Sequence, residues 1–308
     1  MTTRSRSEAG HPSQQHFQRS HIQYQAIGGG SHGDTSIASS LPTVGSVAKS
    51  SPTLVVVKFS KLGRRADPEN SLGIEIAVLK RLTRLGGHAG IIRIVDYHVD
   101  GHTQWMTTPF HSGGNLDHFV KKFPDALSDS FIWQTIYCVT DALHWLFYGI
   151  FPTSSGPLPG WHAFHGDLCL PNLLLTPAIG QGPAYFPHIV IADFGSAEIY
   201  ARPSQKSTQD FAKQQALDLC FFGDYSVKEM TQGARTISGR STQDLDYWSA
   251  HFRNLSRSVD SWVSVSDVLN LLRSFHGAAA VRRLEYVEPL PTAVIDAIKP
   301  LPVLYEHK

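Results

Sequence analysis

The chain has 308 residues, of which 42% are hydrophobic and 17% are charged, and its formal net charge is +1. This length allows one large domain or two small ones, and the composition excludes a chain that is disordered throughout. The near-neutral charge argues against a dedicated nucleic-acid-binding protein, and the three cysteines are too few for a disulfide framework.

The first twenty residues contain few apolar side chains, which predicts a disordered tail over residues 1–20. This stretch lacks the apolar core that a secretory signal needs. The richest apolar stretch, residues 143–151, is interrupted by His144 and is too short to cross a bilayer. We therefore expect no membrane span and a cytoplasmic or nuclear location.

After this tail, the first half of the chain has the pattern of short strands separated by turns. Strands are predicted over residues 21–27, 35–38, 53–59, 93–99 and 103–108. Residues 39–52 are rich in Ser, Pro and Gly and predict a loop. Apolar residues recur at helical spacing before the fourth strand, which predicts an amphipathic helix over residues 69–85.

The second half of the chain is mostly helical. A long helix with one apolar side is predicted by the spacing of Ile132, Ile136, Val139, Leu143 and Leu146. Short strands are predicted over residues 173–175 and 188–192, and further helices over residues 215–230 and 265–275. The sequence thus predicts a small strand-rich lobe, a hinge at residues 109–114 and a larger helical lobe.

Gly28, Gly30 and Gly33 form a G-x-G-x-x-G pattern between two predicted strands. A dinucleotide-binding fingerprint would need a helix directly after the glycines, but strand-like residues 35–38 follow. Two strands joined by glycines suit a flap over nucleotide phosphates, because a Cβ would keep the backbone N–H groups off the phosphates. The pattern by itself is also compatible with an ordinary turn.

Lys58 ends the third predicted strand, and Glu75 lies on the predicted helix. A lysine at this position could reach phosphate oxygens if a carboxylate held it in place. Each residue alone is equally compatible with a solvent-exposed strand end or helix face. The pair gains its significance from the motifs that follow it in the chain.

The segment from His165 to Asn172 contains the pattern H-x-D-x-x-x-x-N, and Asp193-Phe194-Gly195 directly follows a predicted strand. Asn172 and Asp193 offer the hard oxygen ligands that Mg²⁺ prefers, and Asp167 is suited to accept the proton of an attacking hydroxyl. Asp, Asn and Gly also favour plain turns. Both segments in this order, after the glycines and Lys58, favour phosphoryl transfer.

These motifs resemble those of the eukaryotic-type protein kinase family over about residues 22–230. The resemblance implies an α+β, bilobal protein-kinase-like fold. A small β-rich N-lobe would cover residues 21–110. A larger helical C-lobe would cover residues 111–308 and be abridged after the helix that carries Asp218. The resemblance gives Asp218 a structural role as the anchor of the catalytic loop.

The resemblance also implies ATP and Mg²⁺ as cofactors and assigns residue roles. Catalytic roles fall to Lys58, Glu75 and Asp167, and metal binding falls to Asn172 and Asp193. The implied ATP-binding residues are Gly28, Gly30, Ser31, Gly33, Val56, Lys58, Thr108 as gatekeeper, Pro109, His111 and Leu174. An apolar stack that aligns the lobes would consist of Leu79, Ile94, His165 and Phe194.

The sequence departs from the family pattern at several positions. Val56 replaces a small alanine, Gly166 replaces the arginine before the catalytic Asp, and Cys169 replaces a lysine that normally helps to neutralise the γ-phosphate. The missing arginine implies that no activating phosphate is needed. No A-P-E motif follows Asp193, so the segment that docks peptide substrates is expected to be abridged.

Three functions therefore stay open. The first is a protein Ser/Thr kinase with an unidentified protein substrate. The second is a small-molecule kinase of the aminoglycoside/choline type, which H-G-D-L-x-x-x-N and the missing A-P-E favour, although the glycine pattern and the turn at Gly113-Gly114 do not. The third is a pseudokinase that binds nucleotide or partners without transfer, which the abridged peptide-docking segment and Cys169 favour. Neither a nucleic-acid partner nor a particular oligomeric state is indicated.

Overall fold

The computed structural model describes eleven parts of the chain. They are residues 17–30, 33–40, 53–60, 71–100, 103–149, 161–177, 186–200, 208–238, 250, 264–285 and 294. The chain divides into two compact units, Met1–Leu85 with Arg93–Phe110, and Gly86–Ile92 with His111–Lys308.

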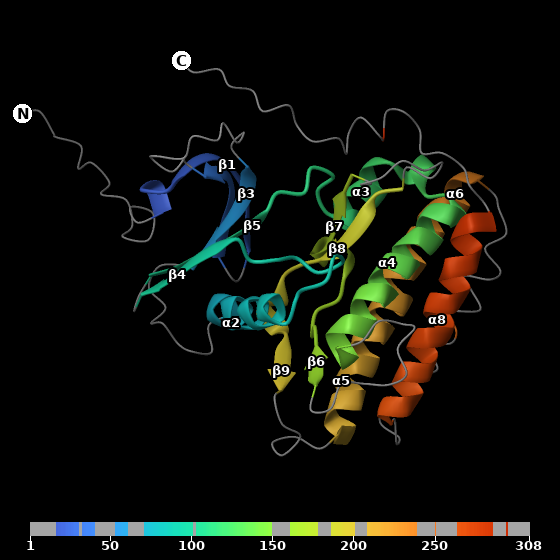
Figure 1. Cartoon of the computed structure of the whole chain (residues 1–308). Helices are drawn as coiled ribbons and strands as arrows, with labels where there is room; N and C mark the ends of the chain where they lie inside the picture. Colours follow the sequence, from blue (N-terminus) through green and yellow to red (C-terminus); the bar gives the residue numbers. More distant parts are fainter. Residues whose placement is uncertain are drawn as a thin grey trace, which may run out of the picture. The chain divides into compact units, whose positions relative to one another are not determined.

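The first unit contains a five-stranded antiparallel sheet in the order β1-β2-β3-β5-β4 (Figure 1). Its strands are β1 (His21–Gly30), β2 (Gly33–Ser40), β3 (Leu54–Phe59), β4 (Asp96–Asp100) and β5 (Thr103–Pro109). Helix α2 (Ser71–Arg84) contacts β5. The predicted strands and amphipathic helix of this part are confirmed, except that residues 93–95 precede β4 rather than belonging to it.

Strands β1 and β2 form a hairpin with the glycine pattern at its closed end. Gly30 pairs with Gly33, and the register shifts at two points, between Gln23 and Gln25 and again before Gly28. Such bulges increase the local twist of a hairpin. The predicted order of strand, glycines and returning strand is confirmed, while Ser31 lies outside the described residues. The loop predicted over residues 39–52 is wrong at its start, because β2 extends to Ser40.

Phe17 corrects the prediction that the disordered tail extends to residue 20. Its side chain is completely buried, and its ring packs edge-on against Phe59 and Trp105, with centroids 5.3 and 5.2 Å away. The ring also stacks on His21 at 4.4 Å. Burial of one large aromatic side chain offsets the conformational cost of ordering this short segment. Residues 1–16 lie outside the described residues.

The second unit is predominantly helical. Its helices are α3 (Leu116–Lys122), α4 (Asp129–Tyr148), α5 (Thr208–Cys220), α6 (Lys228–Ser238) and α8 (Val265–Glu285). Two small antiparallel sheets pair β6 (His162–Phe164) with β9 (Glu198–Tyr200), and β7 (Leu173–Thr176) with β8 (His188–Ile191). The helices predicted over residues 215–230 and 265–275 exist but are longer, and a π-helical segment, Phe221–Val227, joins α5 to α6.

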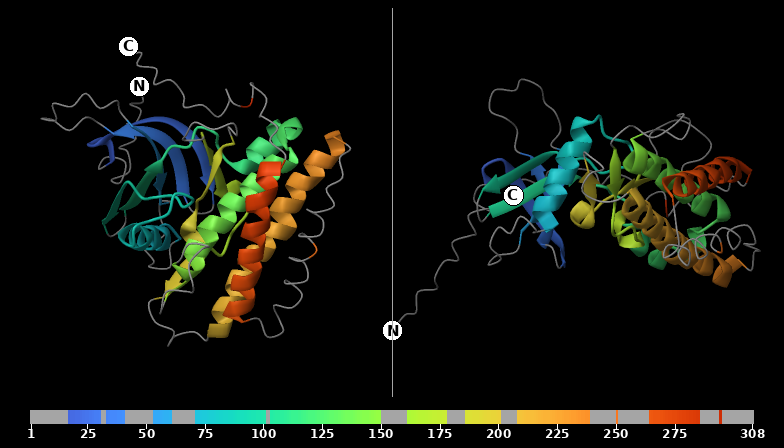
Figure 2. Two further views of the ribbon diagram at one scale, coloured as in Figure 1. Left: turned by 45° about the vertical axis from the view of Figure 1, so that its right-hand side comes forward. Right: turned by 90° about the horizontal axis from the view of Figure 1, so that it is seen from below.

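Helix α4 is the long helix predicted from apolar spacing, and α8 lies along it (Figure 2). The Ser128 side chain caps the N-terminus of α4 by accepting a hydrogen bond from the N–H of Phe131 at 3.2 Å. Gly149 ends the helix in the left-handed region, with φ 64°, where glycine is unstrained. No helix within the described ranges combines the length and the apolar character that a bilayer crossing requires.

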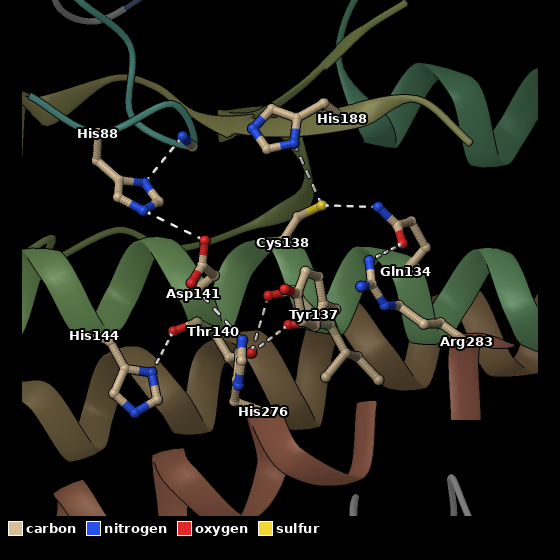
Figure 3. A network of polar contacts seen from close by, with 12 residues as sticks. His88, Gln134, Tyr137, Cys138, Thr140, Asp141, His144, His188, His276 and Arg283 are labelled. Carbon is tan, nitrogen blue, oxygen red and sulfur yellow. Dashed lines mark hydrogen bonds and ion pairs between the residues drawn. The ribbon is translucent and has the colours of Figure 1, made fainter. Parts of the chain in front are cut away.

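A polar network joins α4 to two other segments of the second unit (Figure 3). Asp141 of α4 lies 3.4 Å from Nε2 of His88 and 3.7 Å from Nε2 of His276 on α8. Beside it, Nδ1 of the fully buried His144 bonds to the Thr140 carbonyl at 2.9 Å. The carboxylate of Asp141 therefore lies between imidazole rings carried by two other segments of this unit.

Candidate active site

In the first unit, Lys58 and Glu75 form an ion pair. Strand β3 alternates strictly, with Val55, Val57 and Phe59 buried, so that Lys58 projects from the other face of the sheet. Its Nζ lies 2.8 Å from Oε2 of Glu75 on α2. The carboxylate side chain is only 3% exposed and the lysine side chain 15% exposed. A buried carboxylate needs such a partner, and the pairing in turn fixes the position of the ammonium group.

In the second unit, the segment after β6 holds Asp167 and Asn172 together. The Asn172 side-chain nitrogen donates to the Asp167 carbonyl at 2.8 Å and to Oδ2 of Asp167 at 3.0 Å. Asp167 is exposed, whereas Asn172 is buried. Because the amide nitrogen is turned toward Asp167, the amide oxygen points the opposite way. The arrangement offers an exposed carboxylate and a separately oriented amide oxygen.

Pairing of β7 with β8 brings Asp193 next to this segment. Leu173 pairs with Ile191, and the N–H of Ala192 donates to the Asn172 carbonyl at 2.8 Å. Asp193 follows immediately, with φ 60°, and it is the only described non-glycine residue with a positive φ. Asp is among the few residues that tolerate this region, and strain of this kind is often found at functional sites.

His165 links Asp167 to the same end of β8. Its Nδ1 accepts the N–H of Asp167 at 3.2 Å, so its Nε2 carries the hydrogen and donates to the Ala192 carbonyl at 3.0 Å. Its ring packs edge-on against Phe194 at 4.8 Å. Burial lowers the pKa of His165, which favours the neutral imidazole that these two bonds require. His165 therefore has a structural role here.

Asp218 of α5 fixes the backbone just before Asp167. Its two carboxylate oxygens accept the N–H groups of His165 at 2.6 Å and of Gly166 at 2.8 Å. Burial raises the pKa of Asp218 to about 7, although the two N–H donors act in the opposite direction. The resemblance to protein kinases implied an anchoring role for Asp218, and this geometry gives that role a physical basis.

Gly166 has a structural requirement that the sequence analysis missed. Its φ is 81°, and a Cβ at this position would clash with the carbonyl oxygen of Ser196. The position therefore excludes any side chain unless the Ser196 backbone moves. The glycine directly before Asp167 was the available signal, but its meaning depends on Ser196, which is distant in the sequence.

Cys169 is also close to Asp167. Its Sγ lies 3.7 Å from Oδ1 of Asp167, and its side chain is partly exposed. Burial and then the charge of Asp167 raise the pKa of the Cys169 thiol to about 11. The thiol is therefore neutral at physiological pH, where the family pattern has a cationic lysine.

The oxygen donors of the second unit fit Mg²⁺. Asn172 contributes an amide oxygen and Asp193 a carboxylate, and both are hard ligands. Within the described parts of the chain, no group of three or more His, Cys, Asp or Glu residues could hold a metal ion. Mg²⁺ is commonly held by one or two carboxylates together with substrate phosphates, so a two-residue donor set is compatible with this ion.

The predicted ATP-binding residues fall in both units. In the first unit, Val56 pairs with Thr108, and Val55 pairs with Pro109, on adjacent strands. In the second unit, Leu174 is half-buried on β7, and both ring nitrogens of His111 are buried without a hydrogen-bond partner. Burial lowers the pKa of His111 to about 4, so its ring is neutral. The assignment of these residues to ATP binding remains a prediction.

Comparison with known proteins identifies the family of this chain. The family model for protein tyrosine and serine/threonine kinases matches residues 22–222, about two thirds of the chain. The chain therefore belongs to the protein kinase family. A search of curated proteins found no match.

Proposed function

We propose that this protein is an ATP-dependent protein kinase that transfers the γ-phosphate of Mg·ATP to a Ser or Thr hydroxyl of another protein. The observation that carries the proposal is the arrangement of Asp167, Asn172 and Asp193. An exposed carboxylate and two hard oxygen donors are fixed by backbone pairing at one end of the β7–β8 hairpin. Phosphoryl transfer needs these groups and little covalent chemistry from the protein.

Each residue has a defined task in this proposal. Lys58, held by Glu75, binds phosphate oxygens. Asp167 orients the acceptor hydroxyl and accepts its proton as the new bond to phosphorus forms. Asn172 and Asp193 would hold Mg²⁺. When bound, Mg·ATP supplies the phosphoryl group and the metal charge that offsets the charge of the phosphates. Catalysis then consists mainly of positioning and charge neutralisation.

A second candidate is a small-molecule kinase. Gly166 favours it, because the structure excludes a side chain at the position where protein kinases commonly carry arginine. The family match covers tyrosine and serine/threonine kinases and favours a protein acceptor. The two candidates differ in the acceptor and share the residues that handle ATP.

The test is transfer of labelled γ-phosphate from Mg·ATP by the full chain. The acceptors are the protein itself, a generic basic protein, matched peptides with Ser, Thr or Tyr, and a panel of amino-alcohols. We expect label on Ser or Thr of protein or peptide, lost in Asp167→Ala and retained in Asp125→Ala, which removes an acid from the turn Pro124–Ala126. Label on amino-alcohols alone would establish the second candidate. Absence of label with folded protein would contradict both.

A further inference from the structure

Asp167 has a hydrogen-bond donor on each of its carboxylate oxygens. The side-chain nitrogen of Asn172 donates to Oδ2 at 3.0 Å. The thiol of Cys169 donates to Oδ1 at 3.7 Å, which is within hydrogen-bonding reach because sulfur is larger than oxygen. Two donors on opposite oxygens restrict rotation of the carboxylate about its Cβ–Cγ bond.

The backbone holds both donors at a fixed spacing. Cys169 is extended, with φ −133° and ψ 166°, and it immediately precedes the helical turn Leu170–Asn172. The N–H of Asn172 donates to the Cys169 carbonyl at 2.9 Å and closes this turn. The thiol and the amide therefore approach Asp167 from one short, hydrogen-bonded segment, so that neither side chain needs a distant support.

We infer that Cys169 is a positioning residue for Asp167, orienting the carboxylate through an S–H···Oδ1 hydrogen bond. The inference rests on the proposed function, since it concerns the group that would receive the substrate proton. A neutral thiol supplies a hydrogen-bond donor but no positive charge, so Cys169 can orient Asp167 but cannot neutralise phosphate charge as the usual lysine does.

The hydrogen bond can be observed without any catalytic activity. Donation by a thiol lowers its S–H stretching frequency, which Raman spectroscopy detects in a spectral region free of other protein bands. The full chain contains three cysteines, so the difference spectrum between wild type and Cys169→Ser isolates the Cys169 band. We expect this band at a lower frequency than that of a non-bonded thiol. In Asp167→Ala it should move to higher frequency, and in Asp125→Ala it should not move.

Kinetics then test the positioning role. We expect Cys169→Ala to lower kcat about three- to tenfold, the range for losing one weak hydrogen bond, with KM for ATP unchanged within about twofold. Cys169→Ser keeps a donor, although on a shorter bond to Cβ, and should recover part of the lost rate. A structural role alone would affect Ser and Ala variants alike.

The outcomes separate the inference from the proposed function. A Cys169 band that does not respond to Asp167→Ala overturns the inference whatever the activity. An equal loss of kcat in the Ala and Ser variants, or no loss in the Ala variant, also overturns it. If the band responds but wild type transfers no phosphate to any acceptor, the proposed function fails and the hydrogen bond stands as a structural feature of the loop.

Discussion

The carboxylate of Asp218 accepts the backbone N–H of Gly166 at 2.8 Å, although 52 residues separate the two in the chain. The other carboxylate oxygen binds the neighbouring N–H of His165, and Asp218 is 1% exposed. A buried acid on α5 thus fixes the backbone directly before Asp167. Gly166 itself has a positive φ, of 81°, and a Cβ there would clash with the Ser196 carbonyl, so the residue directly before Asp167 must be without a side chain.

Replacing Gly166 by alanine should destabilise the protein more than an ordinary glycine substitution. Gly166→Ala places a Cβ against the Ser196 carbonyl in addition to the cost of a positive φ. We expect a loss of about 3 kcal/mol or more in the free energy of unfolding. Chemical denaturation of the full chain measures this loss.

Gly114→Ala is the matched control for this substitution. Gly114 also has a positive φ, of 67°, but nothing lies within 4 Å of a Cβ built there. Gly114→Ala should therefore lower the free energy of unfolding only by the cost of a positive φ for alanine, about 1–2 kcal/mol. Equal losses in the two variants would show that the contact with Ser196 does not constrain Gly166.

Phe17→Ala should destabilise the first unit. The side chain is fully buried against Phe59 and Trp105, and removal of such an aromatic ring typically costs about 3–5 kcal/mol. Ile22→Ala on β1 is a suitable control, because the Ile22 side chain is 46% exposed. This variant should lose less than about 1 kcal/mol in the free energy of unfolding. The melting temperatures of both variants are measured by thermal unfolding. Similar melting temperatures would contradict the burial of Phe17 in the core of the first unit.

His144 should make stability depend on pH. Desolvation by burial lowers its pKa from 6.5 to about 4; its charged or titratable neighbours are His276, Asp141 and Arg273. Between pH 6.5 and 4, His144 is protonated in the unfolded chain but stays neutral in the folded protein. The contribution of this residue to the free energy of unfolding therefore falls as the pH falls. The loss reaches about 3 kcal/mol over this range.

A His144→Leu variant isolates this contribution. Asp218 titrates in an overlapping range with the opposite sign, because its raised pKa makes the folded state the better proton acceptor between about pH 4 and 7. Only the difference between variant and wild type is therefore informative. Urea unfolding should show that the variant gains stability relative to wild type as pH is lowered from 6.5 to 4. Parallel pH profiles would contradict the role of His144.

The elements that the sequence predicted best are those with long local patterns. Strand β3 and helices α2 and α4 follow from alternation or helical spacing over many residues, and the structure contains them where they were expected. The motif residues Asp167, Asn172 and Asp193 were found because their chemistry lies in side-chain identity at fixed spacing. The structure then shows what brings them together, which is the pairing of β7 with β8.

Features that depend on distant contacts were missed. Phe17 is a single apolar residue in a polar segment, and only Phe59 and Trp105 make its burial favourable. Strands β6 and β9 contain three residues each, too few for a periodic pattern, and each exists through its pairing with the other. The requirement for Gly166 arises from Ser196 in the same way, through tertiary contact.

The measurement that tests the central claim most directly compares γ-phosphoryl transfer by wild type and Asp193→Asn. The substitution keeps the size of the side chain and removes the charge that would bind Mg²⁺. We expect the transfer rate to fall at least about a hundredfold, while Asp125→Asn keeps the wild-type rate. A folded Asp193→Asn variant that transfers phosphate at the wild-type rate would contradict the assignment of this site.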